Sequence, residues 1–104
     1  MKKLARNPQI VWRNEKRREE EILAALERGE DVGERGSVIL IVGGTMHQLN
    51  LVGGYIWNLC DGSRSLDDVV ESLASEFDVE REVLRHDVEA FVDDLLARGW
   101  LQHV

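Results

Sequence analysis

The residue types that most often carry catalysis or bind metals are few in this 104-residue sequence and lie apart from one another. His47, His86 and His103 occur singly, without the short His and Cys spacings that are typical of zinc sites. The pairs Asp67-Asp68 and Asp93-Asp94 lie in helix-forming segments, where adjacent side chains point apart, so they predict a solvated surface rather than paired catalytic carboxylates. We therefore predict no metal site, no cofactor and no enzyme activity.

Cys60 is the only cysteine, so the chain cannot form an internal disulfide. The thiol follows Ile56 and Leu59 at helical spacing, which predicts a buried position rather than a reactive one. A chain without disulfides fits a reducing compartment, and we expect a cytoplasmic protein. Residues 1–6 are basic but lack the apolar segment of a signal peptide, and no apolar run approaches the roughly 20 residues of a membrane span.

Charge is divided unevenly along the sequence. Residues 1–35 contain 9 Lys and Arg against 8 Asp and Glu, whereas residues 36–104 contain 4 against 12. The larger part of the chain is therefore acidic. It would repel a phosphate backbone and favour a neutral or basic partner.

The first third of the chain predicts one strand and one helix. Residues 9–13 (QIVWR) are β-branched and aromatic and follow a proline, which is tolerated where a strand begins. Residues 15–28 are strong helix formers whose apolar stripe is thin, comprising Ile22, Leu23 and Leu26. Gly29 predicts the end of this helix, and a loop is expected up to residue 36.

The middle of the chain predicts a hairpin followed by a helix. Residues 37–42 (SVILIV) form a continuous apolar run, typical of a strand that is buried on both faces or nearly so. Gly43-Gly44 predicts a tight turn, and residues 45–49 alternate as a return strand. Asn50 is a candidate N-cap for the helix that follows, which Asp61-Gly62 should end.

Two further helices complete the expected fold. Ser65 with Asp68 forms the pattern of a capping box, and the apolar period that follows predicts a helix. Asp78 is a candidate cap for a long helix over residues 80–98, in which we expect Leu84 and Phe91 to be buried. Three helices on a small antiparallel sheet of about three strands make an α+β, winged helix-turn-helix-like fold, with the helix at residues 15–28 as an addition.

Several motifs in this order make the sequence resemble the PqqD family, whose members are also called RiPP recognition elements. The resemblance covers about three quarters of the chain. It rests on Asn7-Pro8-Gln9-Ile10-Val11, Leu49-Asn50, Gly53, Ile56-Trp57, Leu59-Cys60-Asp61-Gly62, Val69-Val70, Asp78, Asp87-Val88 and Gly99-Trp100-Leu101.

The resemblance implies a single peptide-binding domain over residues 1–104, with an inserted helix and loop at residues 15–35. Members of the family are similar to winged helices in fold but bind peptides. They hold the leader of a ribosomally made precursor peptide for a radical SAM enzyme, as in pyrroloquinoline quinone (PQQ) biosynthesis. Because of the insertion, another peptide pathway is an equally open alternative.

An exposed strand edge can bind a peptide by strand addition. In this chain the strand at residues 45–49 should be that edge, as the family's third strand is, and the long C-terminal helix should form the other wall of a groove. The candidate peptide contacts are Met46, His47, Gln48 and Leu49 on the strand, and Val83, Arg85, His86 and Glu89 on the helix.

The inserted helix has two interpretations. Ile22, Leu23 and Leu26 can pack on the chain's own sheet with the charges in water, or Lys16, Arg17 and Arg18 can contact an enzyme or a second copy of the chain in a homodimer. An acidic adaptor that binds a folded protein is the alternative function. DNA binding is disfavoured, because residues 80–98 carry six acidic and three basic residues where a recognition helix needs positive charge.

Overall fold

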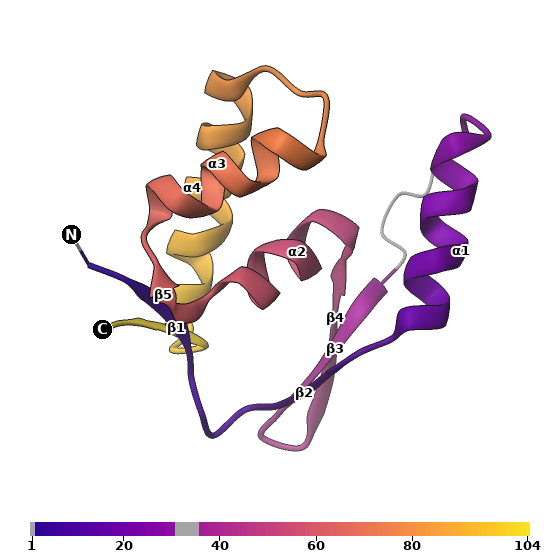
Figure 1. Ribbon diagram of the computed structural model, residues 1–104. Helices are drawn as coiled ribbons and strands as arrows, with labels where there is room; N and C mark the ends of the chain where they lie inside the picture. Colours follow the sequence, from indigo (N-terminus) through magenta and orange to yellow (C-terminus); the bar gives the residue numbers. More distant parts are fainter. Residues whose placement is uncertain (1, 31–35) are drawn as a thin grey trace. The chain divides into compact units, whose positions relative to one another are not determined.

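The computed structural model describes residues 2–30 and 36–104, so the loop predicted after residue 29 lies largely outside the described residues. The described chain forms two compact units, residues 9–54 and residues 1–8 with 55–104, and each is treated separately below. Figure 1 shows the elements in chain order, which are β1 (Leu4–Arg6), β2 (Val11–Asn14), α1 (Lys16–Glu27), β3 (Gly36–Val42), β4 (Thr45–Asn50), α2 (Leu51–Leu59), β5 (Asp61–Arg64), α3 (Leu66–Glu76), α4 (Arg81–Ala97) and β6 (Leu101–His103).

The unit at residues 9–54 is built on an antiparallel sheet in the order β2-β3-β4. Gly43 and Gly44 connect β3 to β4 with φ values of 56° and 80°, the two positive angles that a type I′ hairpin turn requires. Val42 pairs with Thr45 across this turn. The hairpin predicted from the glycine pair is therefore confirmed.

The two faces of this sheet differ sharply in exposure. Val38 and Leu40 on β3 are buried, at 2% and 0% exposure. Ile41, the next residue along the same strand, is 48% exposed. The prediction that β3 is buried on both faces is therefore wrong. Alternate side chains of a strand point to opposite faces, and only one face of this sheet is covered. We call the other one the exposed face; it carries Val11, Arg13, Ile39, Ile41, Met46 and Gln48.

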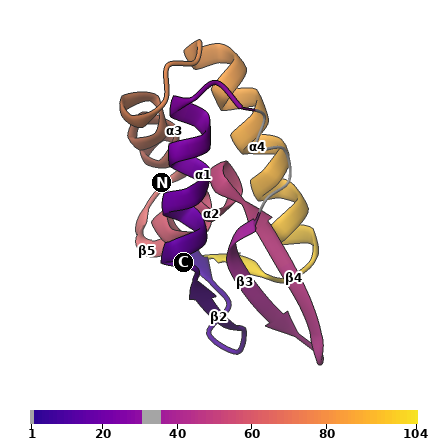
Figure 2. The ribbon, with the colours of Figure 1, turned by 90° about the vertical axis from the view of Figure 1, so that its right-hand side faces the viewer.

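Helix α1 begins directly after β2 and lies alongside β3, which it contacts (Figures 1 and 2). The backbone N–H of Glu15 donates to the carbonyl of Ser37 at 2.8 Å and ties the start of the helix to the sheet. Ile22 is buried as predicted, together with Ala25, but Leu23 and Leu26 are 36% and 42% exposed. The helix therefore buries a narrower stripe than the sequence indicated.

The second unit contains a second antiparallel sheet, in the order β5-β1-β6. The sequence did not predict it, because its strands have only three or four residues and come from three distant parts of the chain. Asp61-Gly62, predicted to end the preceding helix, lies just after α2, and residues 61–64 form β5. The residues after Gly99 and Trp100 form β6, where Leu101 is only 2% exposed.

Helices α3 and α4 supply most of the core of this unit. Ser65 and Asp68 form the predicted capping box at the start of α3. Helix α4 begins at Arg81 with Glu80 at its N-cap position, so the prediction that Asp78 caps it is wrong. Leu84 is buried as expected, but Phe91 is only half-buried, one position away from the buried Val92.

The fold is α+β, as predicted, with a second small sheet added to the expected one. None of the helices in the described residues combines the length and the apolar character that crossing a lipid bilayer requires.

Candidate functional site

Strand β4 forms one margin of the β2-β3-β4 sheet and, among the described residues, pairs only with β3. The C-terminal strand β6 pairs with β1 in the other sheet, and α1 packs against β3. The described strands of the chain therefore leave the outer side of β4 open. This strand is the edge that the sequence predicted.

The turn geometry determines which main-chain groups of β4 point outward. In a two-residue hairpin the flanking residues, Val42 and Thr45, exchange hydrogen bonds, and bonded and non-bonded pairs alternate from there. Thr45 and His47 therefore direct their N–H and C=O groups toward β3. Met46 and Gln48 direct theirs away from the sheet, where a further strand would pair.

The side chains of β4 alternate as predicted. Leu49 is 7% exposed and His47 is half-buried, whereas Met46 is 61% exposed and Gln48 is also exposed. Gln48 lies over Gly36 on β3, since a Cβ added at Gly36 would come within 2.6 Å of its Oε1 atom. The four predicted contacts therefore share one edge strand but lie on two faces of the sheet: Met46 and Gln48 on the exposed face, and His47 and Leu49 on the covered face.

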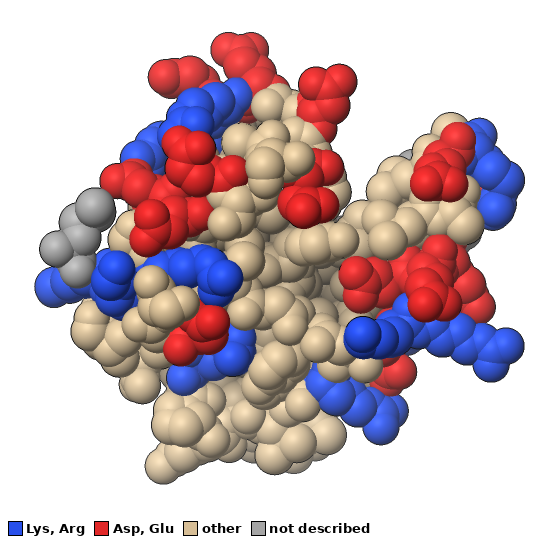
Figure 3. All heavy atoms as spheres, in the orientation of Figure 1, with Lys and Arg blue, Asp and Glu red and all other residues tan. Residues whose placement is uncertain are grey.

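No Asp, Glu, Lys or Arg occurs between residues 36 and 60, although charged residues make up 32% of the chain. Figure 3 shows the resulting contrast, with charged side chains gathered over α1 and over α3 and α4, and none over the β3–β4 hairpin. Exposed edge strands usually carry charges that prevent pairing with other chains. The absence of charge here leaves β4 able to accept another strand.

The exposed face is hollowed farther in from this edge, toward β2. The hollow measures about 280 Å³ and is lined by Val11, Trp12, Arg13, Ile39, Ile41 and Met46. Val11 and Ile41 are 66% and 48% exposed, so much of the lining is apolar surface in contact with water. The sequence analysis missed Val11 and Ile41, because the run SVILIV was interpreted as buried on both faces.

The other predicted contacts lie on α4, in the other unit. Val83 is 50% exposed and His86 is exposed. Arg85 forms ion pairs with Asp67 of α3 and with Glu89, the latter at 3.4 Å. Arg85 and Glu89 are therefore already engaged with neighbours, which leaves Val83 and His86 as the more available side chains of this set.

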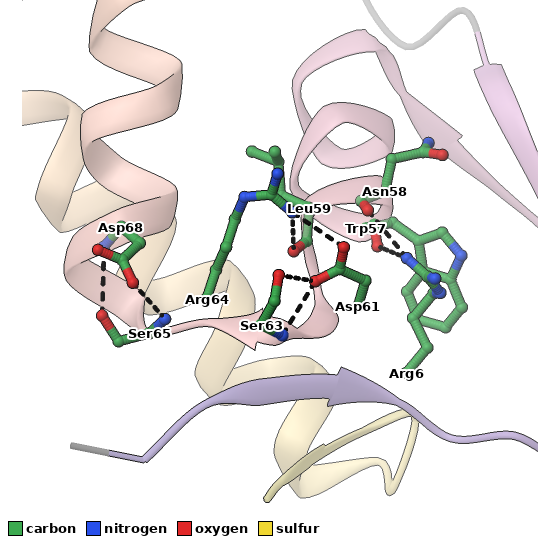
Figure 4. A network of polar contacts seen from close by, with 9 residues as sticks. All are labelled: Arg6, Trp57, Asn58, Leu59, Asp61, Ser63, Arg64, Ser65 and Asp68. Atoms are coloured by element: carbon green, nitrogen blue, oxygen red, sulfur yellow. Dashed lines mark hydrogen bonds and ion pairs between the residues drawn. The ribbon is translucent and has the colours of Figure 1, made fainter.

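A polar network near β5 fixes the end of α2 (Figure 4). The Arg6 guanidinium donates to the carbonyls of Trp57 and Asn58, both at 2.9 Å, and Arg64 donates to the carbonyl of Leu59 at 3.2 Å. Hydrogen bonds from Ser63 and the nearby Arg64 guanidinium lower the pKa of Asp61 to about 2. The two arginines pair with carbonyls at the end of α2, and the Ser63–Asp61 hydrogen bonds hold the adjacent turn. Both roles are structural.

Cys60 is fully buried in the same unit, as predicted. Burial raises the pKa of its thiol to about 11, against a smaller opposing effect of Arg6. At neutral pH the thiol is protonated, which is unfavourable for a nucleophile. Within residues 2–30 and 36–104, no group of three or more His, Cys, Asp and Glu side chains is placed to hold a metal ion.

Lys16, Arg17 and Arg18, the predicted docking residues, are all exposed on the first turn of α1. Arg17 lies 4.0 Å from Glu21, and its side chain is 94% exposed. An ion pair with that exposure holds the guanidinium only weakly. The three cations are therefore available to another molecule.

The fold and the edge together define a class, which is a small α+β protein with an uncharged, open strand of the kind that accepts an extended segment of another chain. The family model described as "Coenzyme PQQ synthesis protein D (PqqD)" matches residues 33–101. The chain belongs to the PqqD family.

A solved structure described as "TbiB1 in Complex with the TbiA(beta) Leader Peptide" has a similar fold. Its TM-score is 0.65, its sequence is 19% identical, and the match covers 94% of each chain. No curated protein sequence matches this chain.

Proposed function

We propose that this chain is a non-catalytic recognition domain. It binds the leader of a ribosomally synthesised precursor peptide by strand addition at β4, and presents that peptide to a radical SAM enzyme. The observation that carries the proposal is the open, uncharged edge of β4. Membership of the PqqD family supports it, as does a solved structure of similar fold whose description includes a bound leader peptide.

The energetics of strand addition require side-chain contacts as well. Met46 and Gln48 present four outward main-chain groups, and each hydrogen bond adds only about 0.5–1.5 kcal/mol net. A micromolar complex requires about 8 kcal/mol. Apolar side chains of the peptide must therefore supply a substantial part of the affinity.

The proposal extends to the first turn of α1. Lys16, Arg17 and Arg18 contact the modifying enzyme while the peptide occupies β4. Their exposure supports this role, and the helix itself is held by Ile22 and Ala25, which are buried.

Replacing Gln48 by Pro tests the proposed edge directly. Proline removes an N–H that points away from β3, so the internal ladder of the sheet is kept, but one hydrogen bond to the peptide is lost. We expect affinity for a synthetic leader peptide that binds the unmodified chain to fall about tenfold. Titration by isothermal calorimetry measures the change.

Two further variants separate the contributions of Gln48. Gln48→Ala keeps the N–H and removes the side chain, so it should bind the leader more tightly than Gln48→Pro. His47→Pro removes an N–H that points toward β3, and it should lower the melting temperature more than Gln48→Pro does. Equal leader binding by Gln48→Pro and Gln48→Ala would show that this edge does not hold the peptide.

A further inference from the structure

Three exposed apolar side chains form a continuous row across the β2-β3-β4 sheet. Val11 pairs with Ile41, and Ile41 pairs with Met46, so the three residues lie directly opposite one another on neighbouring strands. Their exposures are 66%, 48% and 61%. The row runs along the hollow of about 280 Å³ and ends at the open edge.

The neighbouring row on the same face has a different chemistry. Arg13 pairs with Ile39, and Ile39 pairs with Gln48, so this row is polar at both ends. Gln48 is held over Gly36 at its end of the row. The edge therefore presents an apolar position at Met46 and a polar position two residues further along.

A strand added at β4 would continue these rows. Met46 and Gln48 carry the outward main-chain groups, so the peptide residues that pair with them exchange hydrogen bonds with them. Directly opposite residues share a face, with their Cβ atoms about 4.5–5.5 Å apart. The peptide residues opposite Met46 and Gln48 would thus place their side chains on the exposed face.

We propose that the Val11–Ile41–Met46 row is a specificity subsite that accepts a large apolar side chain, aromatic or branched aliphatic, from the peptide residue paired with Met46. The residue paired with Gln48, two positions away, is polar. The inference rests on the proposed function and deepens it, because it states which side-chain pattern the bound segment carries.

The geometry favours the added peptide over other occupants of this row. The row is open at its end on β4, where a fourth strand contributes the next side chain in register. The hollow shares Ile41 and Met46 with the row and extends from them toward β2. A peptide that pairs with β4 places its side chain against Met46 first, so only a large side chain extends past Met46 toward Ile41.

The test is selection from a random library of displayed peptides on the full chain and on two variants. Ile41→Lys places a charge in the middle of the row at a position that is already 48% exposed, so the fold should tolerate it. Val79→Lys is the control, because Val79 is 46% exposed in the other unit. Selected peptides are then resynthesised with alanine at each apolar position, and their affinities are measured.

We expect the unmodified chain and Val79→Lys to enrich peptides with a large apolar residue two positions from a polar one. Alanine at that apolar position should weaken binding to the unmodified chain about tenfold, which is the effect of losing one partly buried apolar side chain. Ile41→Lys should bind the original peptide about tenfold more weakly, and should no longer distinguish it from its alanine version.

Failure of the inference can be told from failure of the proposed function. If the unmodified chain enriches no peptide, peptide binding itself is refuted and the subsite with it. If peptides are enriched without an apolar preference, or Ile41→Lys binds them unchanged, the subsite is refuted and strand addition stands. If Ile41→Lys alters only the sedimentation of the chain, the row is a contact between copies and the subsite is again refuted.

Discussion

At the scale of single residues, the groups most suggestive of chemistry have structural roles in this chain. Asp61 accepts hydrogen bonds from the backbone and hydroxyl groups of Ser63, while Arg6 and Arg64 satisfy carbonyls at the end of α2. Cys60 is buried, and its thiol pKa is raised. The residues proposed to bind a ligand, such as Met46 and Ile41, carry no charge and were recognisable only by their place on an edge or a face.

The acid titration of Asp61 tests this structural interpretation. Ser63 is the main cause of its lowered pKa, so Ser63→Ala should raise that pKa from about 2 toward the ordinary value of 3.8. The pKa of Asp61 is lower in the folded state than in the unfolded state. Its contribution to folding stability is therefore present above the unfolded-state pKa and is lost as pH falls through the folded-state pKa. The variant should therefore lose it at a higher pH.

NMR measures this pKa from the carboxyl chemical shifts. The titration runs from pH 6 to pH 1.5, a range that spans roughly both pKa values. Ser75→Ala is a suitable control, since the Ser75 hydroxyl donates to the carbonyl of Ser72 and is remote in sequence from Asp61. An Asp61 pKa that stays near 2 in Ser63→Ala would mean that the backbone N–H of residue 63 and Arg64, rather than the Ser63 hydroxyl, hold the carboxylate.

At the scale of elements, Gly54 shows how close α2 lies to β3. A Cβ at Gly54 would come within 2.8 Å of both the Ser37 Oγ atom and a Val38 methyl group. Alanine would gain about 1 kcal/mol in helix propensity, but overpacking costs about 1–3 kcal/mol. We expect Gly54→Ala to lower the melting temperature by several degrees, as measured by circular dichroism.

A double variant shows whether contact with Val38 is the cause. Val38→Ala removes the methyl groups that Gly54→Ala would strike, so the two substitutions together should destabilise by less than the sum of their separate effects. A higher melting temperature for Gly54→Ala alone would show that helix propensity outweighs the close approach.

The elements were predictable from the sequence where local patterns determine them. The capping box at Ser65 and the glycine pair at Gly43-Gly44 define their own backbone geometry, so α3 and the hairpin were placed correctly. The β5-β1-β6 sheet was missed, because pairing between residues 4–6 and 101–103 leaves no periodic signal in such short strands. The edge at β4 was predicted, whereas the apolar row was not, because exposure of Ile41 depends on what covers the sheet.

At the scale of the whole molecule, charge separates regions with different proposed roles. Residues 36–60 are uncharged and contain the proposed peptide edge, while the acidic residues are concentrated on the helices that follow. Exposed cations cluster on the first turn of α1, at Lys16, Arg17 and Arg18. Electrostatic complementarity mainly determines association rates and partner choice, so this cluster suits a partner with an acidic surface.

Reversal of the α1 charges separates peptide binding from enzyme docking. The variant Lys16→Glu, Arg17→Glu and Arg18→Glu should bind the leader peptide unchanged, because none of these residues lies on β4. Modification of the full precursor by the proposed radical SAM partner should slow about tenfold, since rim charges act mainly on the association rate. The control reverses Lys2, Lys3 and Arg98 to Glu, which changes the net charge equally at positions in the other unit. If both variants slow modification to the same degree, net charge is responsible and α1 is not the docking site; if neither does, the enzyme approaches from another face.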